Sequence, residues 1–170
     1  MRHHNNQPAL TRYRMKQRLM AIGEDFDIEN EAGERVYHVD GKVMTVRDTL
    51  VITDSQGNQV ATIKEKLVSV KDTMQIYREG EVIASVRKKM FSPFKDRFDI
   101  DVTGSDDLEA EGNIIDHEYE IKRGRETIAT VSKKMFSVRD SYGIEIMPGE
   151  DDVLILASAV IIDMLSHPNN

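Results

Sequence analysis

The chain has 170 residues, a net charge of −7 and no cysteine. This length suits a single domain that buries about 70% of its unfolded surface, and the lack of cysteine excludes disulfides, thiolate metal sites and thiol nucleophiles. The acidic balance argues against general affinity for nucleic acid, because neutralising phosphates requires a basic surface.

The first nine residues are predicted to form a flexible tail, and residues 10–167 a single folded domain. Residues 1–8 contain no apolar segment of the kind that a secretory signal needs. The longest apolar run, 153–165, is interrupted by Ser158 and Asp163 and is too short to span a bilayer, so no transmembrane segment is expected. These features and the cysteine-free composition indicate a cytoplasmic protein, either free or peripheral to the membrane.

A seven-residue pattern recurs six times along the domain. It reads apolar, any residue, Asp, Glu or His, any residue, apolar, any residue, Ile. The closing isoleucines are spaced 24, 24, 24, 21 and 23 residues apart, and a constant period indicates one supersecondary unit used repeatedly. The six copies are 22–28, 46–52, 70–76, 94–100, 115–121 and 138–144.

Each unit is predicted to contribute two antiparallel strands that meet at the corner formed by the pattern. A glycine follows every closing isoleucine within three to five residues, which predicts a hairpin turn after each. Between turns, apolar and charged residues alternate with the period of a half-buried strand, as in Phe98, Ile100 and Val102 against Asp99 and Asp101. Closure of about twelve strands into a barrel would remove the exposed edges of so wide a sheet.

The last element is predicted to be a helix inside the barrel. Glu150, Asp151 and Asp152 suit a helix N-terminus. Residues 153–162 are apolar on all sides except Ser158, which is the pattern of a buried helix. The many β-branched residues would also suit a strand, but a strand could bury both faces and both edges only in mid-sheet. The predicted fold class is therefore mainly β: a twelve-stranded antiparallel closed barrel around a central hydrophobic C-terminal α-helix.

The chain resembles the LURP-one-related family, within the tubby C-terminal-like and phospholipid scramblase superfamily. The matching stretches are Met15-Lys-Gln-Arg-Leu19 with Gly23-Glu-Asp-Phe26, and Ile128-Ala-Thr-Val-Ser-Lys-Lys-Met-Phe136 with Asp140-Ser-Tyr142. The apolar tail that carries Asp163 completes the match, which covers residues 10–166. The resemblance implies the same tubby C-terminal-like barrel around a central helix.

What the resemblance implies about function is less specific. Tubby relatives bind phosphoinositides, scramblase relatives are tied to membranes and calcium, and plant members are linked to defence. Scramblases look lipid-anchored through cysteines, which this chain lacks. No stretch matches the tubby headgroup site, so no ligand residue is carried over from it.

A set of basic residues is the candidate binding site for an anionic ligand. Arg87 to Lys89 and Lys133 to Lys134 occupy equivalent positions in two units, and such clusters suit an anionic headgroup. Solvated strand ends are the structural alternative, favoured by Glu65 at the corresponding place in another unit. Strict alternation would also turn Lys88 inward, unless the strand carries a bulge there or ends at the rim. The candidates are Arg87, Lys88, Lys89, Lys133, Lys134 and Arg139, with Lys66, Lys95 and Arg97 nearby.

Other titratable residues are predicted to be structural. The corner residue of each copy is expected to hydrogen-bond the backbone of its turn, and the acidic pairs to face outward rather than to bind calcium. Asp163, in the apolar helix, needs a hydrogen-bond partner and is expected near a barrel mouth. The corner residues are Glu24, Asp48, Asp72, Asp96, His117 and Asp140, and the acidic groups are Asp25 with Asp27, Asp99 with Asp101, and 106–111.

The sequence predicts a non-enzymatic binding or scaffold barrel, with anionic phospholipid headgroups or a protein as its partner. No catalytic motif, metal ligand set or cofactor motif is present. One alternative is a small-molecule enzyme or carrier with a pocket at a barrel mouth, which a cavity larger than about 300 Å³ would favour. Another is a protein–protein interaction module. The oligomeric state stays open.

Overall fold

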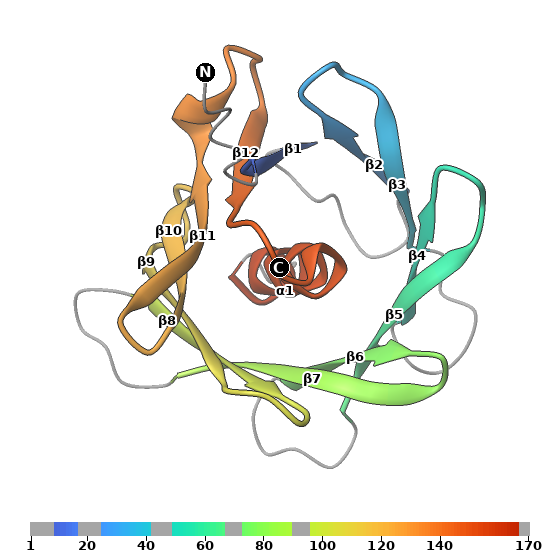
Figure 1. Cartoon of the computed structure of the whole chain (residues 1–170), viewed down its shortest axis with the longest axis vertical. Coiled ribbons are helices and arrows are strands. Elements are labelled where there is room, and N and C mark those ends of the chain that lie inside the picture. Colours follow the sequence, from blue (N-terminus) through green and yellow to red (C-terminus); the bar gives the residue numbers. More distant parts are fainter. Residues whose placement is uncertain (1–8, 17–24, 42–48, 67–72, 90–95, 167–170) are drawn as a thin grey trace, which may run out of the picture.

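Twelve strands close into an antiparallel barrel in the order β1-β12-β11-β10-β9-β8-β7-β6-β5-β4-β3-β2. The computed structural model describes residues 9–16, 25–41, 49–66, 73–89 and 96–166. The α-helix within these residues, α1, lies in the centre of the barrel (Figure 1). The predicted fold class is therefore confirmed. The elements are β1 (Thr11–Lys16), β2 (Phe26–Asn30), β3 (Arg35–Asp40), β4 (Thr49–Asp54), β5 (Gln59–Glu65), β6 (Thr73–Arg78), β7 (Glu81–Lys88), β8 (Asp96–Val102), β9 (Leu108–Asn113), β10 (Glu118–Arg123), β11 (Glu126–Ser132), the 3-10 helix η1 (Lys133–Met135), β12 (Ser141–Ile146) and α1 (Asp152–Ser166).

The sequence repeat corresponds to the even-numbered strands. The closing isoleucine of every copy faces the core and is at most 2% exposed; these residues are Ile28, Ile52, Ile76, Ile100, Ile121 and Ile144. In four hairpins the strand register shifts directly after this isoleucine. A bulge of this kind increases local twist and helps a sheet to curl. The repeat therefore marks both a core position and a point of curvature.

The predicted turn chemistry is confirmed in the hairpins that the structure describes. The turn between β4 and β5 is an example: Asp54 Oδ1 accepts hydrogen bonds from the amides of Gln56 and Asn58, both at 2.9 Å, and Gly57 has a φ of 83°. The hydrogen bonds to Asn58 and Gln56 lower the pKa of Asp54. The prediction was wrong for Gly149, whose turn leads from β12 into α1 instead of into another strand.

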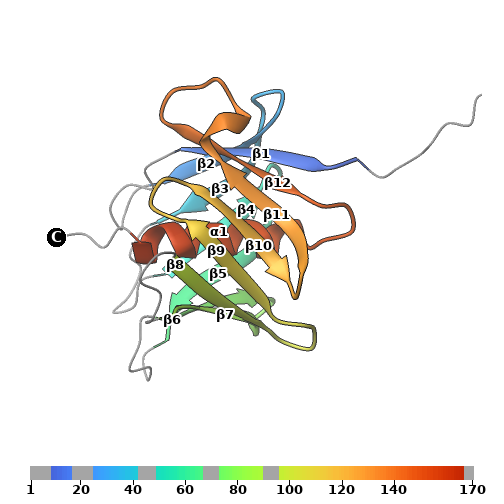
Figure 2. The ribbon, with the colours of Figure 1, turned by 90° about the vertical axis from the view of Figure 1, so that its left-hand side faces the viewer.

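The antiparallel order gives the barrel two different ends. The turns that join β2 to β3, β4 to β5 and their equivalents lie at one end, which we call the hairpin end. The first residues of the even strands, with the described corners before β10 and β12, lie at the other, which we call the corner end. Helix α1 enters at the hairpin end and its C-terminus reaches the corner end (Figure 2). The two ends therefore present different side chains around the two termini of the helix.

Helix α1 fills the interior of the barrel. Its residues from Leu154 to Asp163 are all buried, and they pack against the inward-facing side chains of the strands. The Ser158 hydroxyl donates to the carbonyl of Leu154 at 2.8 Å, so this polar group is satisfied within the helix. No helix of the described residues is long and apolar enough to cross a membrane.

Candidate functional site

The basic residues at the end of β7 form ion pairs with neighbouring strands. Arg87 Nη2 lies 3.4 Å from Asp99 Oδ2, and Lys88 Nζ lies 3.6 Å from Asp96 Oδ1. Lys88 is the last residue of β7, so its departure from alternation is explained by a position at the rim. The positive charges of Arg87 and Lys88 are thus offset by the wall of the barrel.

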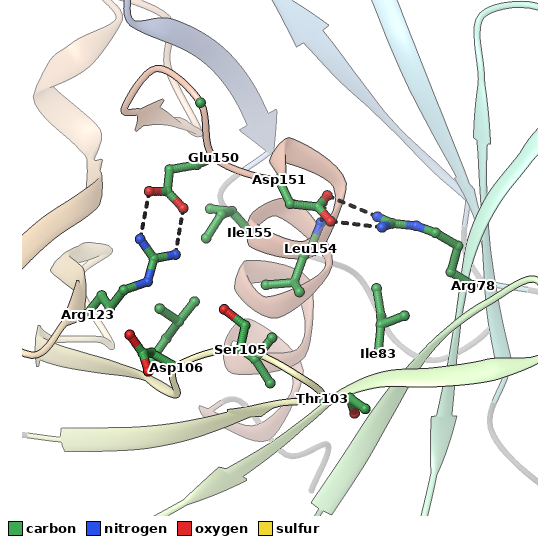
Figure 3. Close-up of a pocket in the computed structure, with 13 residues that line it drawn as sticks. Arg78, Ile83, Thr103, Ser105, Asp106, Arg123, Glu150, Asp151, Leu154 and Ile155 are labelled. Atoms are coloured by element: carbon green, nitrogen blue, oxygen red, sulfur yellow. Dashed lines mark hydrogen bonds and ion pairs between the residues drawn. The ribbon is translucent and has the colours of Figure 1, made fainter.

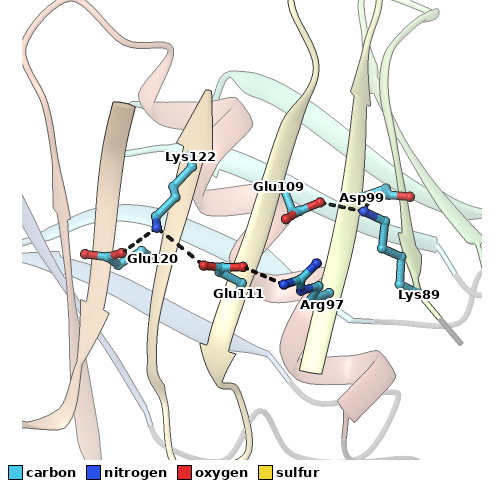
Figure 4. Close-up of polar contacts among 7 residues, drawn as sticks. All are labelled: Lys89, Arg97, Asp99, Glu109, Glu111, Glu120 and Lys122. Carbon is cyan, nitrogen blue, oxygen red and sulfur yellow. Dashed lines mark hydrogen bonds and ion pairs between the residues drawn. The ribbon is translucent and has the colours of Figure 1, made fainter. Parts of the chain in front are cut away.

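Charged residues on the outer face of the barrel form two ion-pair clusters, one around Lys89 and one around Glu111 (Figure 4). The nitrogen–oxygen distances run from 2.5 Å between Lys89 and Glu109 to 3.5 Å between Arg97 and Glu111. The hydrogen bond to Glu109, together with that to Asp99, raises the pKa of Lys89. Several acids that were predicted to face outward therefore have cationic partners. The first cluster includes Lys89, Asp99 and Glu109, and the second includes Arg97, Glu111, Lys122 and Glu120.

The other three candidates lie at the sixth corner, between β11 and β12. The Lys133 amide donates to Glu118 Oε1 at 3.0 Å, and the Lys134 amide donates to Ser132 Oγ at 3.1 Å. Within the described part of the chain, no ion pair involves the side chain of Lys133, Lys134 or Arg139. These cations differ in this respect from those of β7.

Helix η1 is held against the outer face of β12 by a position that suits glycine. A Cβ atom on Gly143 would lie 2.6 Å from Cβ of Met135, closer than side chains pack. The ring of Phe136, which follows η1, lies 6.0 Å from the guanidinium carbon of Arg14 on β1. The backbone that carries Lys133 and Lys134 is therefore placed by packing across β1 and β12.

Two large apolar side chains are exposed at the fifth and sixth corners. Ile115 is 58% exposed and Val138 is 46% exposed, and both occupy the first position of their copy of the repeat. The two corners are adjacent, because the ring of His117 stacks on that of Tyr142 with 4.2 Å between centroids. We call the exposed surface here the corner patch. It consists of Ile115, Lys133, Lys134, Val138 and Arg139.

A buried polar cluster lies beneath the same two corners. His117 Nε2 is 2.7 Å from Asp163 Oδ1 on α1, and both side chains are at most 5% exposed. This confirms that Asp163 has a hydrogen-bond partner close to a barrel end. Burial raises the pKa values of Tyr119 and Tyr142, and the nearby carboxylate of Asp163 raises them further. The cluster therefore fixes the C-terminal part of α1 to the barrel wall.

The corner residues have more than one role. His117 and Asp140 both have positive φ, at 54° and 58°, a conformation that occurs at turns and in which Asp and His are enriched. Asp96 instead pairs with Lys88. The described corner residues therefore do not share the single predicted role of hydrogen-bonding the backbone of their turn. The predicted residues Glu24, Asp48, Asp72 and Lys95 lie outside the described residues.

A pocket of about 360 Å³ opens at the hairpin end beside the first turn of α1 (Figure 3). Arg78 donates to both oxygens of Asp151 at 2.8 and 2.9 Å, and Arg123 donates to both oxygens of Glu150 at 2.9 and 2.8 Å. Burial acts to raise the pKa of Asp151, but hydrogen bonds from Arg78 and the backbone outweigh it and lower this pKa. The apolar part of the lining consists of Ile83, Val102, Leu108, Leu154 and Ile155.

A cavity of about 550 Å³ at the corner end includes Arg139 in its lining. His38 Nδ1 lies 2.7 Å from Asp27 Oδ1, and its Nε2 lies 3.7 Å from Asp25 Oδ2, so the acidic pair near the start of β2 contacts a histidine. No group of three or more His, Asp or Glu side chains within the described ranges is arranged to hold a metal ion. Val138 and Arg139 of the corner patch thus also line this cavity.

Sequence reasoning missed the arginines of the hairpin end. It assigned Glu150 and Asp151 to the start of α1 but gave them no partners. A signal was present, since Arg78 and Arg123 each stand two residues after a closing isoleucine. That position is near the end of an even strand, where the helix begins.

These features define a mainly β protein whose closed barrel surrounds its own C-terminal helix. The sequence model of the LURP-one-related family matches residues 11–163, so the chain belongs to this family. No curated protein matches the chain. Among solved structures, it is similar to the X-ray structure of a protein from Arabidopsis thaliana, with a TM-score of 0.70 and 18% sequence identity over 95% of this chain and 94% of that one. At this identity the similarity supports the fold.

Proposed function

We propose that this protein is a non-catalytic binding barrel that attaches peripherally to the cytoplasmic face of a membrane through anionic phospholipid headgroups. The observation that supports this is the ion pairing of the basic residues, which differs between the corner patch and β7. Lys133, Lys134 and Arg139 form no ion pair within the described residues, whereas Arg87, Lys88 and Lys89 are paired with acids. Cations that form no ion pair within the described residues are the ones that can pair with a headgroup.

The net charge of −7 does not prevent local attraction. At physiological ionic strength, charges more than about 8 Å apart are largely screened. Each basic residue near an anionic leaflet contributes about 1 kcal/mol of attraction. Three such residues give weak, reversible and salt-sensitive binding, as expected of a peripheral protein.

Replacing Lys134 and Arg139 together with glutamate should weaken binding to vesicles of phosphatidylcholine and phosphatidylserine by at least about tenfold. The reason is that two attractive charges become repulsive. The measurement is co-sedimentation of the protein with vesicles over a range of lipid concentration. The wild-type protein should not sediment with vesicles of phosphatidylcholine alone.

The matched control replaces Arg35 and Arg125 with glutamate. The two control residues are exposed, as are Lys134 and Arg139, but they lie at the hairpin end of the barrel. Because both double variants change the net charge equally, an effect of overall charge would weaken both. Equal loss in the two variants, or equal binding of the wild-type protein to neutral vesicles, would refute the proposal.

A second candidate function, carriage of a small molecule, is favoured by the pocket at the hairpin end. Its volume of about 360 Å³ lies within the range of ligand pockets. Native mass spectrometry of the purified protein should then show added mass that is lost in Ser105→Trp, which fills the pocket. The variant Ser55→Trp, in another exposed hairpin turn, should retain it. A measured mass of the wild-type protein equal to that of the polypeptide alone would count against this function.

A further inference from the structure

The first apolar position of the sequence repeat has no role in the core of the two corners that the structure describes. The closing isoleucines and most residues at the second apolar position are buried. Ile115 and Val138, at the first position of their copies, are instead 58% and 46% exposed. The repeat thus places a large apolar side chain at the tip of each of these corners without burying it.

The surroundings of these side chains are polar and partly basic. Arg139 follows Val138 directly, Lys133 and Lys134 belong to the same corner, and the Lys133 amide contacts Glu118 at the start of β10, just after the corner of Ile115. A surface that combines exposed apolar side chains with lysine and arginine suits the boundary between headgroups and acyl chains. The exposed side chains of Lys134 and Arg139, which form no ion pair within the described residues, therefore favour an anionic bilayer over an uncharged partner.

Attraction by charge alone would be weak at this surface. Asp116, Glu118 and Asp140 lie in the same two corners and equal the basic residues Lys133, Lys134 and Arg139 in number. Asp116 is held by Asn113, whose side-chain amide donates to it at 2.7 Å, and the carboxylate of Glu118 accepts from the Lys133 amide. Stable attachment therefore requires a contribution besides the basic residues.

We infer that Ile115 and Val138 insert into the acyl boundary of an anionic membrane, with Lys133, Lys134 and Arg139 contacting the headgroups around them. This inference rests on the proposed function and adds the mode of attachment. The hairpin end, with the pocket and the entry of α1, would face away from the membrane. The barrel would keep its closed fold on binding, since neither tip packs in the core.

The chain contains no tryptophan, so a single substitution provides an unambiguous fluorescent reporter. In Val138→Trp and Ile115→Trp, adding vesicles that contain phosphatidylserine should shift the emission to shorter wavelength. Lipids brominated on the acyl chains should quench the same emission. Met147→Trp is the matched control, because Met147 is also an exposed apolar residue, 41% exposed, but follows β12 at the hairpin end.

A second measurement separates insertion from attraction by charge. Ile115→Asp should lower partitioning into anionic vesicles by about tenfold while leaving the thermal melting curve unchanged. One outcome is vesicle binding that depends on Lys134 and Arg139 while the fluorescence of neither Val138→Trp nor Ile115→Trp changes. In that case insertion is refuted and the proposed function stands.

The remaining outcomes also decide the question. A response of Met147→Trp in place of Val138→Trp would show that the opposite end faces the membrane and would overturn the inference. Absence of any vesicle binding would refute the proposed function itself. Self-association that is lost in Ile115→Asp, without vesicle binding, would assign the corner patch to a protein partner instead.

Discussion

Replacing Ile161 with aspartate is expected to abolish cooperative folding. Ile161 is 0% exposed and lies within the run of buried residues in α1. The substitution removes apolar contacts and buries a carboxylate that has no partner at that position. The combined loss, more than about 5 kcal/mol, is comparable to the whole stability of a typical domain. Far-ultraviolet circular dichroism during heating would measure the effect.

The matched control is the same exchange at an exposed isoleucine. Ile115→Asp should melt like the wild-type protein, since its side chain is 58% exposed. A cooperative transition retained in Ile161→Asp, near the wild-type temperature, would contradict the position of α1 inside the barrel.

Replacing His117 with aspartate should destabilise the protein by about 3–5 kcal/mol. The buried carboxylate of Asp163 would lose the imidazole 2.7 Å away and face a second carboxylate instead. Chemical denaturation monitored by circular dichroism would give the change in the free energy of unfolding. Because His117 also stacks on Tyr142, part of the loss would come from packing.

Two further variants separate these contributions. In His117→Asp with Asp163→Asn, the repulsion is removed, so much of the lost stability should return. The converse exchange at the exposed sixth corner, Asp140→His, should change stability by less than about 0.5 kcal/mol. If His117→Asp and Asp140→His had equal effects, the buried pair would have no special role.

The architecture was predictable from sequence because the repeat and the burial pattern agree. Every closing isoleucine is buried in an even strand, and the largely apolar segment 153–165 forms the enclosed helix. Apolar and charged residues alternate with a period of two, and isoleucine recurs at a nearly fixed interval. Together these patterns leave few alternatives for the direction of each strand. The register shifts after the isoleucines were not predictable, since they depend on how each turn fits its strands.

The candidate site was harder to predict because its charges depend on pairing between strands. Lys89 and Lys134 look alike in sequence, yet Lys89 contacts Glu109 from two strands away. Arg78 and Asp151 are 73 residues apart, and their contact follows from the path of the helix. The exposure of Ile115 was equally hidden, because its position in the repeat resembles that of a core residue.

The pairing of His117 with Asp163 did leave a signal in the sequence. His117 is the one corner residue of the six copies that is not an acid, and Asp163 is the one charged residue between 153 and 165. His117 departs from the repeat and Asp163 departs from the apolar segment, and these two residues contact each other in the structure. Comparing such exceptions would have suggested the contact before the fold was known.

The histidine at position 117 also bears on how the helix is oriented, because a barrel built from six similar units does not by itself fix the rotation of a helix inside it. A central rod inside such a cylinder has several nearly equivalent rotational settings. An imidazole at one unit, and acids at the corresponding position of the other five, would favour the setting in which Asp163 points to the fifth unit. One residue can thereby select a unique azimuth for the rod, as a single polar residue selects the register of a coiled coil.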